Sequence, residues 1–221
     1  MPIRNMPQSA LGVGIALLAA ATIAFSAESD LSVNARLLLA ARNSDAAGID
    51  RALAAGASPD SRNRLGETAL VVALKKKDMA NARRMLAAGT DVNQAAVNGI
   101  TPLMAASFAG DLEFVEQLLA RGADPKPADR LGKNAVTYAA GEGHASIVKA
   151  LLAKGVDANA VYKNDLTALM WAAGYGRTDA ARALLEAGAR TDPRDNRGKT
   201  ALDIARDGGF KETAALLEGW K

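Results

Sequence analysis

The chain of 221 residues contains no cysteine and a single histidine, and its formal net charge is +3. The lack of cysteine excludes disulfides and thiol chemistry, and one histidine without cysteine leaves no cluster with the composition or spacing of a metal site. A net charge this close to zero also argues against a nucleic-acid-binding protein.

The N-terminal stretch, residues 1–26, is predicted to be a signal peptide. Arg4 is the only charged residue ahead of an uncharged, mostly apolar run at 10–25, and Ala24-Phe25-Ser26 places small residues at the two positions that a signal peptidase reads. The run approaches the ~20 residues that cross a bilayer, so an uncleaved membrane anchor is the alternative. We therefore expect an exported protein in the periplasm or secreted, or one anchored in the membrane and facing the periplasm.

The rest of the chain, residues 30–221, reads as one domain built from a repeat of 33 residues. Thr101 has equivalents at Thr68, Asn134, Thr167 and Thr200. Glycine recurs in the same register at Gly56, Gly89, Gly122, Gly155 and Gly188. A fixed period of this length is typical of a stack of one repeated unit. The units are predicted at about 31–63, 64–96, 97–129, 130–162, 163–195 and 196–221.

Each unit is predicted to hold two short helices and an extended loop. The Thr hydroxyl caps the first helix, and Pro102 suits the next position because the N–H there has no helical partner. The first helix ends after about two turns at a glycine, for which Lys77 is the exception. The second helix buries apolar pairs such as Leu118-Leu119 and ends at the recurring glycine. Asn, Asp and Gly then form a loop with a tight turn.

The first and last units differ from the others. In the first, Ser32 is predicted to cap a helix over 33–42, and a second helix covers 45–55. The last unit carries charged residues, Asp203 and Arg206 among them, where inner units are more apolar. Terminal repeats of a stack need a polar outer face, so we interpret these units as the two caps.

These features resemble the ankyrin repeat, which shares the period and the Thr-Pro-Leu-His-x-Ala signature. Gly143-His144-Ala145-Ser146-Ile147-Val148 and Leu119-Ala120-Arg121-Gly122-Ala123-Asp124 match the family consensus closely. The resemblance implies an all-α solenoid of helix-turn-helix units joined by β-hairpin-like loops, with about six repeats including two caps. Together with the predicted signal peptide, the resemblance indicates an exported ankyrin repeat protein of the bacterial type.

The sequence departs from the ankyrin signature at three kinds of position. The signature histidine is replaced in every unit, by Val71, Met104, Thr137, Met170 and Asp203. Asp165 stands where the other hairpins have a turn glycine, which predicts the most strained hairpin because a non-glycine residue at positive φ costs free energy. Asn134-Ala135-Val136 is predicted to be the weakest helix start.

No catalytic site is expected. His144 matches a structural histidine of the family, and nothing in the sequence pairs it with a nucleophile. Asp91, Asp124, Asp157 and Asp192 recur only because the unit recurs, so we interpret them as a structural row. No cofactor or metal is predicted, and the chain is interpreted as a non-enzyme.

The resemblance implies that a protein partner is bound by the hairpin tips and the first helices, which line a concave surface. Carried over to this chain, the candidate partner-binding residues are Arg64, Lys75, Lys76, Phe108, Arg130, Lys133, Tyr138, Lys163, Trp171, Tyr175, Arg197 and Lys199. The four aromatic residues among them would be neighbours and would form an anchor patch. Packing between repeats is the alternative for Tyr138 and Trp171. Six basic residues lie at the tips, at positions 64, 130, 133, 163, 197 and 199, against one acidic residue, Glu67. We therefore expect a partner with an acidic segment.

We therefore predict a non-catalytic protein-binding module that acts as an exported scaffold or as a protective or regulatory partner of another envelope protein. A secreted factor that binds a protein of another cell is the first alternative, and an accessory subunit of an enzyme is the second. We expect a monomer, with no nucleic acid bound and with membrane contact only if the N-terminal segment is uncleaved.

Overall fold

The computed structural model describes residues 31–220. The signal peptide or anchor predicted at 1–26 lies outside these residues. Within them, no helix is both long enough and apolar enough to cross a membrane.

Twelve α-helices occur in pairs along residues 31–220, together with one short 3-10 turn, η1 (Lys163–Asp165). The pairs are α2 (Val33–Asn43) with α3 (Ala46–Ala54), α4 (Ala69–Lys75) with α5 (Met79–Ala87), α6 (Pro102–Ala109) with α7 (Leu112–Ala120), α8 (Ala135–Glu142) with α9 (Ala145–Ala153), α10 (Ala168–Gly174) with α11 (Thr178–Glu186), and α12 (Ala201–Asp207) with α13 (Lys211–Gly219). The expected all-α solenoid of about six helix-turn-helix units is confirmed, while the unit boundaries stay a prediction.

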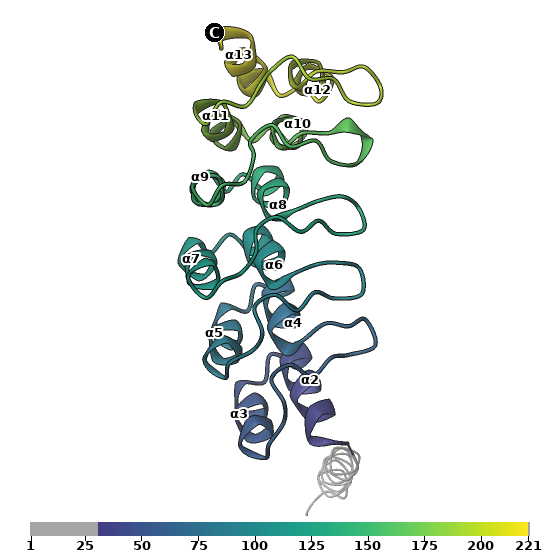
Figure 1. The fold of residues 1–221 in the computed structure, drawn as a ribbon, viewed down its shortest axis with the longest axis vertical. Coiled ribbons are helices and arrows are strands. Elements are labelled where there is room, and N and C mark those ends of the chain that lie inside the picture. The colour runs from purple at the N-terminus through teal and green to yellow at the C-terminus, as the bar shows by residue number, and fades with distance from the viewer. Residues whose placement is uncertain (1–30, 221) are drawn as a thin grey trace, which may run out of the picture.

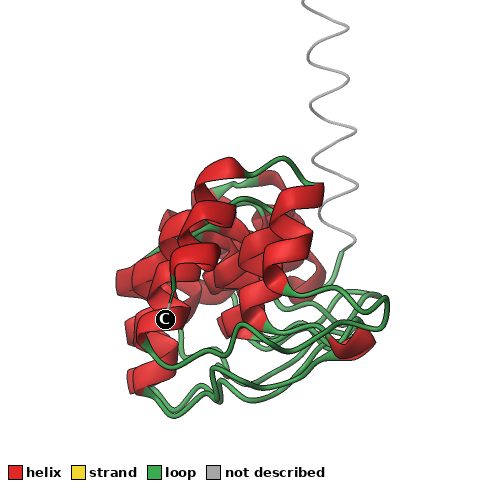
Figure 2. Cartoon of the chain, turned by 90° about the horizontal axis from the view of Figure 1, so that it is seen from above, coloured by secondary structure: helices red, strands yellow, loops and turns green. Residues whose placement is uncertain are grey.

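The pairs are stacked in layers (Figures 1 and 2). The first helices of the pairs form the middle layer, the second helices flank them on one side, and the loops project on the other side (Figure 1). Each loop folds back on itself like a hairpin, and antiparallel bridges join Arg62 to Thr68 and Val161 to Thr167. The first helices, the second helices and the loops therefore each form a row that runs the length of the stack.

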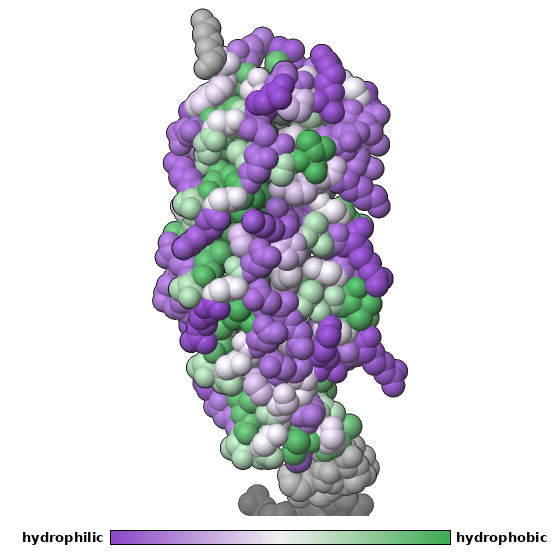
Figure 3. Space-filling view, viewed as in Figure 1, coloured by the Kyte–Doolittle hydropathy of each residue, from purple (hydrophilic) through white to green (hydrophobic). Residues whose placement is uncertain are grey.

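Alanine lies where neighbouring first helices meet. Ala73, Ala106, Ala139, Ala172 and Ala205 occupy one register position, and none of them is exposed to solvent. A methyl side chain lets neighbouring helices approach closely, so small side chains form the part of the core that lies between successive first helices. Larger side chains such as Phe114 fill the space between first and second helices. Hydrophilic residues cover much of the face seen in Figure 3, with smaller hydrophobic patches between them.

Every predicted threonine cap is present. The Thr101 hydroxyl oxygen accepts the backbone N–H of Met104 at 3.2 Å, and Thr68, Thr167 and Thr200 act in the same way. The start at Asn134, which we expected to be the weakest, has a complete capping box instead. Asn134 Oδ1 accepts the Thr137 N–H at 3.1 Å, and Thr137 Oγ1 accepts the Asn134 N–H at 2.9 Å. Thr137 thus replaces the signature histidine with a second cap.

Left-handed residues end the helices and turn the hairpins where the sequence predicted them. The recurring glycines after the second helices have φ between 83° and 87°, and Lys77 takes φ 57° in place of a glycine. In the hairpin at 162–166, Asp165 has φ 59° and the preceding Asn164 has φ 64°. The predicted strained hairpin is confirmed, and the strain extends over two non-glycine residues rather than one.

Neighbouring loops are joined by a repeated set of hydrogen bonds. Asn93 Oδ1 accepts the Asp124 N–H at 2.9 Å, and Asn93 Nδ2 donates to the Gly122 carbonyl at 3.0 Å. Asn159, two repeats later, makes the same pair of bonds to the next loop, and Asp60 accepts the Asp91 N–H at 2.8 Å. These bonds hold the loops that they join at a fixed offset from one another.

Candidate functional site

The four candidate aromatic residues lie on consecutive first helices and form two ring pairs. Phe108 on α6 meets Tyr138 on α8 edge to face, with ring centroids 6.3 Å apart. Trp171 on α10 stacks on Tyr175 at the end of the same helix, with centroids 6.1 Å apart and planes within 12°. Tyr175 is 52% exposed, whereas the other three rings are half-buried. The row therefore combines packing between repeats with an accessible surface.

Lys133 joins the two ring pairs. Its Nζ lies 4.1 Å from the centroid of Trp171 and 5.5 Å from that of Tyr138, so the ammonium sits against two aromatic rings. A second lysine, Lys77, places its Nζ 5.2 Å from the centroid of Phe108. We call Phe108, Lys133, Tyr138, Trp171 and Tyr175 the aromatic row.

The Tyr138 hydroxyl is engaged inside the protein. It donates to Asp129 Oδ2 at 2.7 Å, and Asp129 also accepts the backbone N–H groups of Leu131 and Lys133 through Oδ1. Burial of the phenol, reinforced by the hydrogen bond from the neighbouring carboxylate, raises the pKa of Tyr138 above its usual range. Tyr138 therefore offers a partner its ring and not its hydroxyl proton.

Two hollows lie beside the aromatic row, one lined by Phe108 and Tyr138 and the other by Lys133 and Trp171. One, of about 170 Å³, lies between α4, α6 and α8 and is lined mainly by apolar side chains, including Ile100, Met104 and Phe108. The other, of about 250 Å³, lies between the hairpins at 129–133 and 162–166, and Trp171 contributes to its wall. Such hollows beside aromatic rings can receive side chains of a partner.

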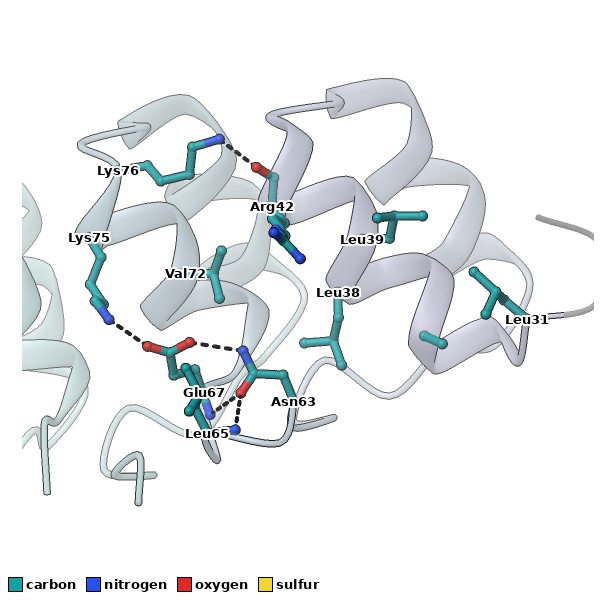
Figure 4. A pocket seen from close by; sticks show the side chains of 11 residues that line it. Leu31, Leu38, Leu39, Arg42, Asn63, Leu65, Glu67, Val72, Lys75 and Lys76 are labelled. Atoms are coloured by element: carbon teal, nitrogen blue, oxygen red, sulfur yellow. Dashed lines mark hydrogen bonds and ion pairs between the residues drawn. The ribbon is translucent and has the colours of Figure 1, made fainter. Parts of the chain in front are cut away.

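A larger hollow, of about 650 Å³, lies at the N-terminal end of the stack between α2 and α4 (Figure 4). Leu31, Leu38 and Leu39 line one side of it, and Lys75 and Glu67 line the other. The sequence analysis missed this hollow. The signal was present, because three consecutive leucines at 37–39 cannot all face the core of one short helix.

Lys75 and Lys76 are already bonded within the protein. Lys75 Nζ lies 2.6 Å from Glu67 Oε1, and Lys76 Nζ donates to the backbone carbonyl of Arg42. Burial alone would raise the pKa of Glu67, but the hydrogen bonds from Lys75 and Asn63 outweigh it and hold the pKa below its ordinary value. Figure 4 shows this cluster beside the leucines.

The hairpin cations fall into two groups. Arg197 binds Asp195, with Nη2 to Oδ2 at 2.6 Å, and Lys199 pairs with Asp207. In the described part of the chain, no ion pair engages Arg64, Arg130, Lys133 or Lys163. The hairpins also carry Asp129 and Asp195, which are buried at the base of their hairpins, and Asp165, which is exposed on the tip beside Lys163. The unpaired positive charge is therefore smaller than expected and lies mainly in the middle of the stack.

The arrangement contains no recognisable catalytic geometry in the described residues. His144 Nε2 lies 3.3 Å from the Phe108 carbonyl oxygen, and its ring packs against Gly110. This contact across repeats supports the structural interpretation of His144. Residues 31–220 hold no group of three or more His, Asp or Glu side chains placed to bind a metal ion.

Two residues of this surface escaped the sequence analysis. Lys77 is named above only as the exception to the helix-ending glycine, although its Nζ lies over the ring of Phe108. Asp129 is not among the candidates, although it accepts the hydroxyl proton of Tyr138. The first contact depends on the spatial offset between adjacent repeats, and the second depends on how the hairpin folds back onto the helix that follows it.

Comparison with known families agrees with this geometry. The family model described as ankyrin repeats in three copies matches residues 37–129 and again residues 136–219, which is more than half of the chain. No curated protein sequence matches the chain. The helix pairs, the capped first helices and the hairpin loops occupy the matched segments. The chain belongs to the ankyrin repeat family.

Proposed function

We propose that the protein is a non-catalytic binding module that holds a protein partner against its concave face, where the hairpins and first helices meet. Ankyrin repeats imply protein–protein interaction in general. The aromatic row is the observation that supports this location, because rings flanked by unpaired cations are the side chains that dominate protein interfaces.

The partner that fits this surface carries an acidic segment. Arg130, Lys133 and Lys163 lie on adjacent hairpins without an ion pair in the described residues, so a row of carboxylates would find complementary charge. We propose that this protein is exported, because residues 1–26 carry the features of a signal peptide. The protein would then act as an exported scaffold or as a protective or regulatory partner of another envelope protein.

Affinity capture from the native envelope fraction tests this function. The bait is residues 27–221, and the comparison is the Phe108→Ala/Tyr175→Ala double variant. We expect a protein retained by the bait to be lost with the variant, since removal of an anchor ring typically costs more than about 1 kcal/mol of binding free energy. Equal capture by both baits would show that the aromatic row is not the binding surface.

The location is tested separately. The mature chain is expected in the periplasm, with Met1 to Ser26 removed, and mass spectrometry of the periplasmic, medium and membrane fractions checks this. Recovery from the medium would favour a secreted factor. A chain that retains Met1 in the membrane fraction would favour the anchored form.

A further inference from the structure

In two hairpins an ion pair links the hairpin to the first helix that follows it. Glu67 and Lys75, eight residues apart, form an ion pair of 2.6 Å, and Lys199 and Asp207, at the same positions four repeats later, form another. Lys133 occupies this hairpin position in the middle of the stack, but its counterpart eight residues on is Gly141. Lys133 therefore lacks the ion-pair partner that the charged residues Glu67 and Lys199 have at the same position.

The ladder of hydrogen bonds between loops is interrupted beside Lys133. Lys126 stands where Asn93 and Asn159 form their bonds, and a lysine cannot accept a backbone N–H. At the tips, backbone bonds join Leu65 to Val97, Asn98 to Arg130 and Asn164 to Asn196, at 2.8 to 3.0 Å. Among the described residues, no equivalent bond joins Leu131 to Lys163.

Only one hydrogen bond joins these two loops in the described part of the chain. It runs from Asn134 Nδ2 to the Tyr162 hydroxyl, 2.8 Å away and at the base of the hairpins. The tips still approach closely, because a Cβ added at Gly132 would lie 2.6 Å from Lys163 Cβ. The hollow of about 250 Å³ lies between the two hairpins, at the junction where the ladder is interrupted.

The lining of this cleft is cationic and apolar. It consists of Leu131, Lys133, Lys163, Asn164, Leu166 and Trp171. No carboxylate contributes to it, and Asp165 on the same hairpin lies outside the lining. The indole Nε1 of Trp171 is buried and has no hydrogen-bond partner within the described residues. Two like charges with no carboxylate in the lining favour the binding of an anion in the cleft.

Lys133 is also held in place before any ligand arrives. The rings of Trp171 and Tyr138 flank its Nζ at 4.1 and 5.5 Å, which limits the freedom of a long side chain. Binding through a cation that is already positioned loses less conformational entropy.

We propose that the cleft between the hairpins at 129–133 and 162–166 binds a carboxylate side chain of an acidic peptide segment, with Lys133 as the principal cation and Lys163 as the second. An apolar side chain next to that carboxylate packs against Leu131 and Leu166, which line the same cleft. The inference rests on the proposed function of the aromatic row and narrows it to one place and one chemistry.

The test is a titration followed by NMR of the indole N–H groups. The protein is recovered from cells that express the full 221-residue sequence and is labelled with ¹⁵N. It has two tryptophans, Trp171 and Trp220, so each indole resonance can be assigned. The probe is the peptide acetyl-Glu-Glu-Leu-Glu-Glu-amide at millimolar concentrations, and its all-Gln counterpart is the neutral control. We expect the acidic peptide to shift the Trp171 resonance, with the Trp220 resonance unchanged.

Matched variants separate this cleft from general electrostatic attraction. Lys133→Gln should weaken binding about tenfold, in line with the loss of a charged hydrogen bond, and Lys133→Arg should restore most of it. Lys199→Gln removes the same charge from the same register position, but that lysine is already paired, so binding should change less than about twofold.

Gly141 offers a second pair of variants. A Cβ added at Gly141 would lie 3.6 Å from the nearest ring carbon of Tyr175, which is an ordinary contact, so Gly141→Ala should bind as the parent does. Gly141→Asp should give Lys133 the internal carboxylate that Lys199 has, and should abolish the shift of Trp171.

Several results would overturn the inference. The Trp171 resonance could stay unchanged, the Gln peptide could shift it equally, or Lys199→Gln could weaken binding as much as Lys133→Gln. Inorganic phosphate could also shift it as strongly as the peptide, which would make the cleft a general anion site. If Trp171 does not respond while the Phe108→Ala/Tyr175→Ala variant still loses its captured protein, this inference fails and the proposed function stands.

Discussion

Among single residues, those that replace the histidine of the ankyrin signature either cap the first helix or fill the core. Thr137 and Asp203 replace the signature histidine and close capping boxes with Asn134 and Thr200. Met104 and Met170 at the same position are buried and extend the core instead. A side chain at this position can either satisfy the helix terminus or fill space, and both outcomes allow the first helix to begin.

Asp195 shows how a buried carboxylate holds a hairpin together. Its Oδ1 accepts the backbone N–H groups of Arg197 and Lys199 at 2.9 Å, and its Oδ2 binds the Arg197 guanidinium. Burial alone would raise the pKa of Asp195, but these hydrogen bonds outweigh it and hold the pKa below its usual range. A depressed pKa in the folded state means that the ionised form stabilises the fold.

We therefore expect Asp195→Asn to reduce the pH dependence of stability in acid. The contribution of Asp195 is complete above the unfolded pKa of about 3.9 and is lost as the pH falls through the lower folded value. The variant should have a lower free energy of unfolding at neutral pH and a smaller decrease between about pH 5 and pH 2. Urea denaturation at several pH values measures this, and the exposed Asp179→Asn is the control. An unchanged pH profile would contradict the assigned role.

At the scale of elements, successive repeats interlock through the residue that begins each second helix. His144, Arg177 and Phe210 occupy this position in the C-terminal half and pack onto Gly110, Gly143 and Gly176, respectively. In the N-terminal half, Asp45, Asp78 and Asp111 occupy the position and cap their own helices. The same register position therefore caps its own helix in the N-terminal half and contacts the preceding repeat in the C-terminal half, and Asp111 does both, because its Oδ2 lies 2.8 Å from Arg83 Nη2.

Gly110 is constrained twice, because it has φ +91° and because a Cβ there would lie 2.4 Å from His144 Cε1. We expect Gly110→Ala to lower the free energy of unfolding by about 2–4 kcal/mol, since a left-handed alanine alone costs about 1–2 kcal/mol. Gly89→Ala is the matched control, with φ +84° and no atom within 4 Å of the added Cβ, so it should show the backbone cost alone. Urea denaturation compares the two. Equal losses would mean that the His144 contact contributes nothing.

Over the whole molecule, contacts between adjacent repeats stabilise the stack along its full length. First helices pack in an unbroken row, from α2 on α4 to α10 on α12. The loops form a parallel ladder, but that ladder is broken between the loops at 121–134 and 154–167, where Lys126 replaces asparagine. In a stack where each repeat contacts only its neighbours, one weak junction lowers the coupling between the two halves.

We expect Lys126→Asn to stabilise the protein by about 1–2 kcal/mol, because the asparagine can form the two hydrogen bonds that Asn93 and Asn159 make. The unfolding transition should also become more cooperative, with a larger m-value if the two halves unfolded separately before. The reverse change, Asn93→Lys, should cost a similar amount. A Lys126→Asn variant with unchanged stability would show that the loops at this junction do not take the repeated geometry.

The repeat, the helix starts and the left-handed turns could be predicted from the amino-acid sequence. These features depend on hydrogen bonds and backbone conformations within about five residues. Thr101 alone therefore indicates a helix start, and Gly122 alone indicates a left-handed helix end. The strained hairpin at Asp165 was predictable for the same reason. The prediction of a weak helix start at Asn134 was wrong, because the capping box there also requires Thr137, three residues further along the chain.

The side-chain contacts between repeats could not be predicted from the sequence and follow from the packing of the folded chain. The sequence placed Lys133, Tyr138 and Trp171 on one surface, but it could not show that one ammonium lies between two rings, because that contact depends on the offset between adjacent helices. The same offset determines which cations are paired and leaves a cleft where Lys126 interrupts the ladder. Side chains more than 30 residues apart are brought together by packing, and packing sums many weak contacts that no short stretch of sequence contains.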